Sequence, residues 1–420
     1  MWLKSVKKLS LLYDILFSVL LVSLTLSTAL PNIITGFLIL IYCLDKFYLK
    51  NKSDSKVGYS LAILIFLVLY MCVINVLKSA NEDFNILSRY LIFIIIPFLA
   101  ERATRKKLLK LSFIIGINIC TIYSFCLITD HYIQNYSLPF GNNHMVNKII
   151  LIERPYLGFM CTISSILSIN LAQKLNRSSL LLKSYLAFCT ICSISLLILI
   201  SARMSIISII IIGLYFLFIL FKKGIINIRY IWISVIIISS GLIFLISQTS
   251  LGDRFYITNN WEKTIKKISI YEPRVTIWDC AFEIMSENKE FNYLTGFGSF
   301  NQTQQKLTFC YSSKIQNESK KEYYISEGFN SHNQFLDFLL TGGLIGFLLF
   351  IFFIASLFYK KDIVKDKFHI AIIITFVLFF SVENVLHRQL GCYMFGLLFL
   401  FIDNSEKDTW SLGKFTGMVR

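Results

Sequence analysis

Long apolar runs and short polar connectors alternate over nearly the whole chain. A helix of ~20 apolar residues crosses the hydrocarbon core of a bilayer, whereas a membrane β-barrel would show alternating apolar and polar positions. The pattern therefore predicts an all-α polytopic membrane protein with about 12 transmembrane helices. The predicted spans cover residues 9–28, 32–48, 58–77, 86–100, 111–129, 155–173, 184–200, 204–221, 230–247, 338–358, 368–382 and 389–402.

One connector, between spans 9 and 10, is far longer than the others. It divides the chain into spans 1–9 (residues 1–248), a loop (residues 249–337), and spans 10–12 with a short tail (residues 338–420). The loop is rich in Phe, Tyr and Trp, a composition that favours a small folded unit over a linker. A loop that is at least partly helical is therefore predicted.

A helix within this loop is predicted to begin at Pro273, because proline is favoured in the first helical turn. Its buried face is predicted from apolar residues at helical spacing, namely Val275, Trp278, Ala281, Phe282 and Met285. Further on, Gly296-Phe297-Gly298 predicts a turn, where glycine lets the backbone approach a partner or a ligand.

Composition agrees with a membrane location. Only 16% of the residues are charged and the mean hydropathy is +0.65, whereas soluble domains carry about 25% charged residues. Most of the ten cysteines lie inside predicted spans, where they act as small apolar residues. Cys280 and Cys310 lie in the loop. They either form a disulfide in an oxidising compartment or stay reduced, with Cys280 buried on the loop helix.

Basic residues are distributed unequally between the two ends of the predicted spans. Of the 41 Lys and Arg residues, 25 lie at one set of ends and only six in the opposite short loops. Because Lys and Arg accumulate in cytoplasmic loops, both termini are predicted to be cytoplasmic and the long loop external. The net charge of +16 reflects this bias. No basic stripe with interleaved aromatics occurs, so nucleic-acid binding is not predicted.

A titratable side chain stands where the long loop meets the tenth span. Ser331-His332-Asn333 precedes the apolar run, on what is predicted to be the first turn of a helix. Histidine can accept or donate a proton near neutral pH, so His332 is a candidate general base. The alternative is a capping or interfacial histidine. Asn333 is a candidate helix cap or substrate ligand.

Two arginines on the same predicted face are candidate anion ligands. Arg203 follows Ser201 and Ala202 in a tight turn between two apolar runs, where an arginine is costly unless it has a role. Arg274 lies at a helix start, where a cation opposes the helix dipole. The alternatives are that Arg203 snorkels to the phosphates of membrane lipids and that Arg274 is solvated or locally paired.

Three further polar residues are predicted on this face. Arg154 and Tyr156 open the sixth span, and Glu383 lies between the last two spans near lipid depth, where it needs a cationic partner. All three are candidate substrate-binding residues. No paired-aspartate, HExxH or EF-hand pattern occurs, so neither a metal site nor a cofactor is predicted.

Two arginines and one base at a membrane surface suit a lipid-linked pyrophosphate. Guanidinium groups bind phosphate oxygens in pairs and can stabilise a departing diphosphate. A base can deprotonate an acceptor hydroxyl. The set therefore predicts transfer of a glycosyl group at the outer leaflet.

The chain resembles the O-antigen ligase and polymerase family of bacterial membrane glycosyltransferases over most of its length. The resemblance rests on Arg203 after Ser201, Pro273-Arg274 with Trp278, the segment 296–300, Ser331-His332-Asn333 followed by the segment 343–346, and Arg154-Pro155-Tyr156-Leu157-Gly158.

The resemblance implies a GT-C-like fold in the bacterial inner (cytoplasmic) membrane, with a periplasmic loop and a periplasmic active site. It implies a glycan on undecaprenyl pyrophosphate as donor and a lipid A–core sugar hydroxyl as acceptor. Arg203 and Arg274 would hold the pyrophosphate, and His332 would activate the acceptor hydroxyl without a metal.

Three other functions stay open at the level of the sequence. A polymerase of the same family joins lipid-linked repeat units, and a related branch glycosylates Ser or Thr of secreted proteins. A non-enzymatic carrier or flippase of lipid-linked glycans is the third. Carriers usually show two related halves, whereas the polar groups here gather at one face, which favours an enzyme.

Overall fold

The computed structural model describes residues 2–48, 58–78, 83–136, 143–175, 179–225, 227, 229, 272–359 and 365–403. Within these ranges the regular elements are helices, apart from one isolated bridge between Asn292 and Gly296. The membrane part contains α1 (Trp2–Ser23), α2 (Leu30–Tyr48), α3 (Tyr59–Leu77), α4 (Phe84–Arg102), α5 (Lys106–Asn135), α6 (Asn143–Ile149), α7 (Arg154–Lys174), α8 (Leu180–Leu199), α9 (Arg203–Lys222), α16 (Gln334–Tyr359), α18 (Lys367–Phe380) and α19 (Gln389–Phe401).

These helices agree with the predicted apolar runs. Each predicted span that falls on described residues corresponds to one helix, and the ninth (230–247) lies outside the described residues. Seven helices in the described part of the chain are long and apolar enough to cross a membrane. The chain is therefore an all-α polytopic membrane protein.

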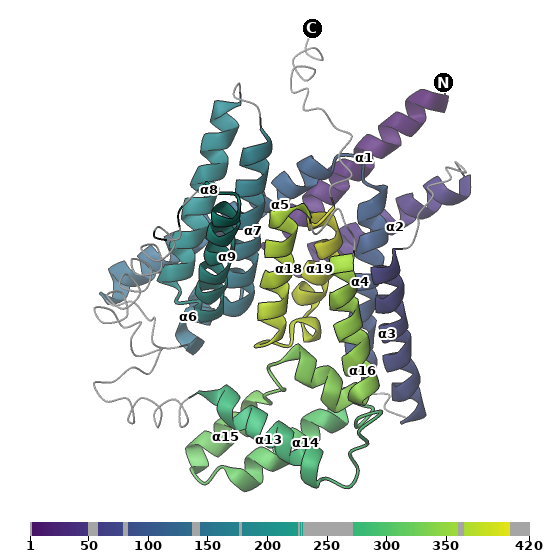
Figure 1. Cartoon of the computed structure of the whole chain (residues 1–420), viewed down its shortest axis with the longest axis vertical. Coiled ribbons are helices and arrows are strands. Elements are labelled where there is room, and N and C mark those ends of the chain that lie inside the picture. The colour runs from purple at the N-terminus through teal and green to yellow at the C-terminus, as the bar shows by residue number, and fades with distance from the viewer. Residues whose placement is uncertain are drawn as a thin grey trace.

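Two short helices occupy the middle of the assembly. α18 and α19 lie between a group formed by α7, α8 and α9 and a group that includes α3, α4 and α16 (Figure 1). α18 has 14 residues and α19 has 13, whereas α5 has 30. Interlocking phenylalanine rings join this centre to its neighbours. Phe395 of α19 lies 5.2 Å from Phe93 and from Phe353, and 5.4 Å from Phe380, between ring centroids.

One end of the helices carries ion pairs between basic and acidic residues. Arg102 at the end of α4 pairs with Asp45 of α2 at 2.5 Å, and Lys106 at the start of α5 pairs with Asp403 after α19. This is the end predicted to be cytoplasmic. The folded loop unit lies at the opposite end (Figure 1).

The described part of the long loop, from residue 272, is a compact helical unit. It contains α13 (Pro273–Glu287), α14 (Phe300–Lys314) and α15 (Glu318–Glu327), and residues 249–271 lie outside the described residues. The unit has its own apolar core, which includes Leu336 and Leu340 of α16. Cys280 of α13 and Cys310 of α14 form a disulfide, which decides between the two alternatives left by the sequence.

The buried face of α13 differs in part from the predicted one. α13 begins at Pro273 as predicted, Ala281 is buried, and Trp278 and Met285 pack against the core of the loop unit, but Val275 and Phe282 are exposed. The buried face consists of Ile277, Cys280, Ala281 and Ile284. The disulfide turns the Cys280 side of the helix toward α14, a constraint that periodicity alone does not carry.

The loop unit is joined to α16 through main-chain hydrogen bonds. The predicted turn at Gly296-Phe297-Gly298 is present, with φ of 64° and 78° at its glycines. The N–H of Phe297 donates to Leu340 O at 2.9 Å and that of Gly298 to Thr341 O at 2.8 Å. These bonds are available because α16 is broken at Gly343, where φ is 64°. Backbone groups freed by such a break in a membrane helix need partners within the protein.

Candidate functional site

Arg203 stands at the start of α9, directly after the predicted turn. Ser201 adopts a φ of 52°, which closes the connection between α8 and α9 within three residues. Arg203 Nη1 donates to Glu272 Oε2 at 2.8 Å. The first cation of the site is thus tied to the residue that precedes α13.

Arg274 joins three segments through its guanidinium group. Its Nη1 donates to Glu272 Oε1 at 2.9 Å, its Nη2 to Glu383 Oε1 at 2.5 Å, and its Nε to the carbonyl of Val382 at 3.1 Å. Glu383 lies in the connector between α18 and α19. It therefore has the cationic partner that its predicted depth in the membrane required.

His332 faces the other oxygen of the same carboxylate. Its Nδ1 lies 3.2 Å from Glu383 Oε2, so the ring can donate to the carboxylate there and leave Nε2 for another partner. The backbone of His332 has a φ of 43°, and its N–H donates to Asn330 Oδ1 at 3.1 Å. The residue lies in a turn just before α16 rather than on the predicted first helical turn.

Asn384 fixes the turn that carries His332. Its Oδ1 accepts from the N–H of Asn333 at 2.6 Å and from Ser331 Oγ at 3.1 Å, and its Nδ2 donates to Asp337 Oδ1 at 3.1 Å. Trp278 of α13 adds a hydrogen bond from Nε1 to Ser331 O at 3.0 Å. The histidine is thus held from the connector on one side and from the loop unit on the other.

The charges of the site balance one another. Burial raises the pKa of Glu383, but the hydrogen bond with His332 and the charge of Arg274 outweigh it and hold that pKa below the ordinary 4.5. Burial also raises the pKa of Glu272, and Arg203 and Arg274 lower it by more. Burial lowers the pKa of Arg274, while the two carboxylates raise it above its ordinary value. Both carboxylates are therefore ionised at neutral pH.

The cations and the imidazole are more accessible than the carboxylates. The side chains of Arg203, Arg274 and His332 are 23, 24 and 25% exposed, whereas those of Glu272 and Glu383 are 13 and 12% exposed. The two carboxylates are thus more buried than the three basic side chains. An anion that approaches from outside meets two guanidinium groups and one imidazole.

Residues 188–351 are similar to the protein family described as O-antigen ligase. A comparison with the curated proteins finds no match. The matched segment runs from within α8 into α16, and it contains Arg203, Arg274 and His332 but not Glu383.

The remaining predicted residues lie around this candidate site. Tyr156 of α7 places its hydroxyl 3.5 Å from the carbonyl of Asn384, beside the connector. Asn333 is a helix cap, because its Oδ1 accepts from the N–H groups of Phe335 and Leu336 at the start of α16. Arg154 is buried at the start of α7, and its N–H donates to Asn147.

Glu272 and Asn384 were not singled out as site residues from the sequence. Glu272 could have been predicted, because it directly precedes Pro273-Arg274 and an arginine near lipid depth such as Arg203 needs an acidic partner. No spacing pattern indicates Asn384, because its partners Ser331, Asn333 and Asp337 lie around the start of α16, far from it in the chain. Within the described residues, no group of His, Cys, Asp or Glu is arranged to hold a metal ion.

Proposed function

We propose that the protein is an O-antigen ligase-type glycosyltransferase. It transfers a glycan from undecaprenyl pyrophosphate to a sugar hydroxyl of lipid A–core. The observation that carries the proposal is the continuous chain of contacts Arg203–Glu272–Arg274–Glu383–His332. It joins two candidate phosphate ligands to one candidate base, and all three are more exposed than the two acids between them.

In this mechanism the two arginines bind the pyrophosphate of the donor. A guanidinium group carries five N–H donors, so one arginine can contact phosphate oxygens and a carboxylate at the same time. When the bond between the sugar C1 and the phosphate oxygen breaks, the departing undecaprenyl diphosphate gains negative charge. Fixed cations at that position stabilise the transition state more than the ground state.

His332 is the proposed general base. The acceptor hydroxyl gives its proton to the imidazole while its oxygen forms the new bond to the sugar C1. Glu383 accepts from Nδ1, which leaves Nε2 as the proton acceptor and stabilises the imidazolium that forms. Bond making, bond breaking and proton transfer then balance without another reactant.

The proposed location is the bacterial inner membrane, with the site on the periplasmic side and both termini in the cytoplasm. The disulfide between Cys280 and Cys310 supports this orientation, because disulfides persist in oxidising compartments such as the periplasm. The basic residues at the opposite end support it as well.

The proposal is tested by glycan display in cells that lack this gene and carry wild type, Arg203→Ala, Arg274→Ala or His332→Ala. A ligase requires loss of glycan from lipid A–core and accumulation of polymerised lipid-linked glycan in the deletion strain and in all three variants. Core that carries a single repeat unit would identify a polymerase. Normal glycolipids with underglycosylated secreted proteins would identify a protein transferase. Full rescue by all three variants would contradict an enzymatic role.

A further inference from the structure

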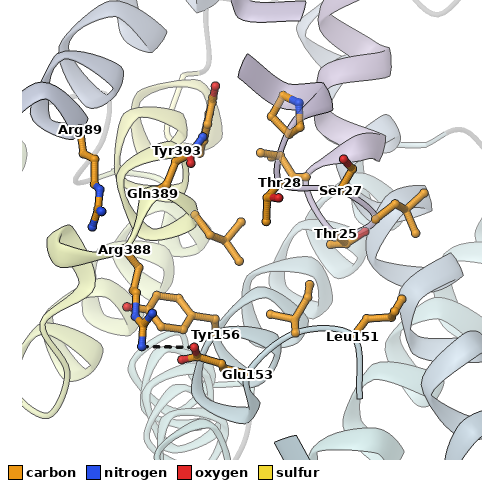
Figure 2. Close-up of a pocket in the computed structure, with 15 residues that line it drawn as sticks. Thr25, Ser27, Thr28, Arg89, Leu151, Glu153, Tyr156, Arg388, Gln389 and Tyr393 are labelled. Carbon is orange, nitrogen blue, oxygen red and sulfur yellow. Dashed lines mark ion pairs between the residues drawn. The ribbon is translucent and has the colours of Figure 1, made fainter. Parts of the chain in front are cut away.

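A cavity lies near the proposed site, beside the connector between α18 and α19. Its volume is about 630 Å³. It is bordered by the connector between α1 and α2, the start of α7, and the start of α19, and its wall also includes Arg89 of α4 (Figure 2). Arg203, Arg274 and His332 do not line it.

The connector forms a border shared by the cavity and the site. At one point it presents Glu383 to Arg274 and His332, and five residues later it presents Arg388 to the cavity. Tyr156, which lines the cavity, reaches the carbonyl of Asn384, the residue next to Glu383. A ligand in the cavity therefore lies beside the connector that carries Glu383, and it does not occupy the positions of the two arginines.

One wall of the cavity has polar side chains that are already held in place. Gln389 Nε2 donates to Asn32 Oδ1 on α2, and the hydroxyl of Tyr393 donates to the same oxygen at 3.0 Å. The Tyr393 hydroxyl also lies 3.0 Å from Thr35 Oγ1. A wall of ordered amide and phenol groups is suited to sugar hydroxyls.

The cavity also contains an exposed ion pair, whose acidic partner a ligand anion could replace. Arg388 Nη2 lies 3.2 Å from Glu153 Oε1, and these side chains are 62 and 47% exposed (Figure 2). Exposed pairs contribute little to stability, so a phosphate or carboxylate can replace Glu153 at low cost. Arg89 adds a second cation to the same wall, fixed by a hydrogen bond to the carbonyl of His387.

Apolar residues complete the lining. Leu24 and Leu26 come from the connector between α1 and α2, Leu151 and Ile152 from the segment before α7, and Leu390 from α19. Cations, fixed hydroxyl-binding groups and apolar side chains in one cavity match an amphiphile with an anionic sugar head.

We propose that this cavity binds the acceptor, an anionic saccharide attached to a lipid. This assignment rests on the proposed function, because it needs the donor pyrophosphate to occupy Arg203 and Arg274. Glycosyl transfer requires donor and acceptor to approach the base from different directions. The connector that carries Glu383 borders both the arginines, proposed to bind the donor, and the cavity, proposed to bind the acceptor.

The first test is a binding measurement on the purified full chain in nanodiscs. The probes are fluorescent lipid A–core, the same lipid after phosphatase treatment, and a lipid-linked single repeat unit. We expect Arg388→Gln to weaken binding of an anionic probe by about tenfold, as loss of one charge-assisted contact would. Lys223→Gln, exposed after α9 at the opposite end, is the matched control and should bind like wild type.

A kinetic test separates this proposal from the proposed function. Arg388→Gln should raise the KM for the acceptor about tenfold and leave the donor KM and kcat near wild type. Binding of no probe, or equal binding by wild type and Arg388→Gln, would overturn the acceptor assignment. Probe binding that depends on Arg388 combined with unimpaired transfer by His332→Ala would instead overturn the proposed mechanism and leave the cavity assignment in place.

Discussion

The Nη2 of Arg274 lies 2.5 Å from Oε1 of Glu383, although 109 residues separate them in the chain. The second oxygen of the same carboxylate faces His332. One buried acid therefore sets the position of a candidate phosphate ligand relative to a candidate base. It also joins the segment that is similar to O-antigen ligases (residues 188–351) to a connector outside that segment.

Replacement of Glu383 by Gln should reduce turnover more than donor binding. The amide keeps the shape of the side chain but cannot stabilise an imidazolium, so we expect kcat to fall about 10²- to 10³-fold, within the usual contribution of general acid–base catalysis. Steady-state kinetics with purified enzyme measure this. Glu327→Gln, exposed at the end of α15, is the matched control. An unchanged kcat in Glu383→Gln would argue against stabilisation of the His332 imidazolium by Glu383.

Replacement of either arginine by lysine should fail to preserve activity. A lysine keeps the charge but cannot contact two phosphate oxygens and Glu272 at once. We expect Arg203→Lys and Arg274→Lys each to reduce kcat/KM for the donor at least about tenfold, a loss of ~1.4 kcal/mol in transition-state binding. Arg105→Lys, at the opposite end of the molecule, should behave like wild type. Equal activity of all three variants would refute bidentate phosphate binding.

The combined variant Arg203→Lys with Arg274→Lys is expected to be less impaired than the product of the single effects. The two side chains share Glu272, and residues in one network are not additive. A double-mutant cycle on kcat/KM measures this coupling. Strict additivity would mean that the two guanidinium groups act on separate ligands.

Stability should depend on the acids of the site in a defined pH range. The pKa values of Glu272 and Glu383 lie below 4.5 in the folded protein, so their ionised forms stabilise it fully above about pH 4.5. That contribution is lost as pH falls through the lowered folded-state values. The Tm of Glu272→Gln/Glu383→Gln should therefore be below wild type at pH 7, and the difference should shrink as pH falls below 4.5. A constant Tm difference would contradict this.

Loss of the disulfide should destabilise the loop unit. The crosslink closes a 30-residue separation, for which the chain-entropy estimate is about 3–4 kcal/mol. We expect Cys280→Ser/Cys310→Ser to lower the Tm of the purified protein and to reduce transfer, because α13 carries Arg274. Cys126→Ser, a free exposed cysteine on α5, is the control. A reductant should shift the Tm of wild type and leave that of the double variant unchanged.

Gly343 is predicted to tolerate no side chain. It has a φ of 64°, and a Cβ there would lie 2.3 Å from the carbonyl carbon of Leu294, where main chain cannot move aside. We expect Gly343→Ala to abolish folding or lower the Tm strongly. Gly213→Ala is the matched control, because nothing lies within 4 Å of its Cβ and alanine favours a helix by about 1 kcal/mol. Similar Tm values for the two variants would refute the importance of the break.

Much of the helical part could be predicted because lipid imposes a simple pattern. A backbone that must satisfy its own hydrogen bonds in hydrocarbon forms long apolar helices, and such runs are visible in the sequence. Arg203 and Glu383 were visible for the same reason, since a charge at that depth needs a partner. The pairing itself was not predicted, because Arg203 meets Glu272 and Glu383 meets Arg274 and His332 across segments distant in the chain.

Other features depended on contacts that no local pattern records. The face of α13 follows from the disulfide with α14, and the turn at residues 296–298 pairs with main-chain groups freed by the break in α16. The cavity near Arg388 gathers residues from the connector between α1 and α2 and from α2, α4, α7 and α19, and it leaves no spacing signature. Sequence patterns thus located the basic groups but not the scaffold that aligns them.

The shortness of α18 has a consequence for how a lipid-linked donor reaches the site. Its 14 residues rise about 21 Å, whereas the hydrocarbon core is about 30 Å thick. Glu383 follows three residues after this helix. α18 lies between other helices (Figure 1), so protein rather than lipid surrounds its short apolar length. Under the proposed function, the pyrophosphate of the donor would have to leave the headgroup level to reach Glu383 and Arg274, while its polyprenyl tail stays in the membrane.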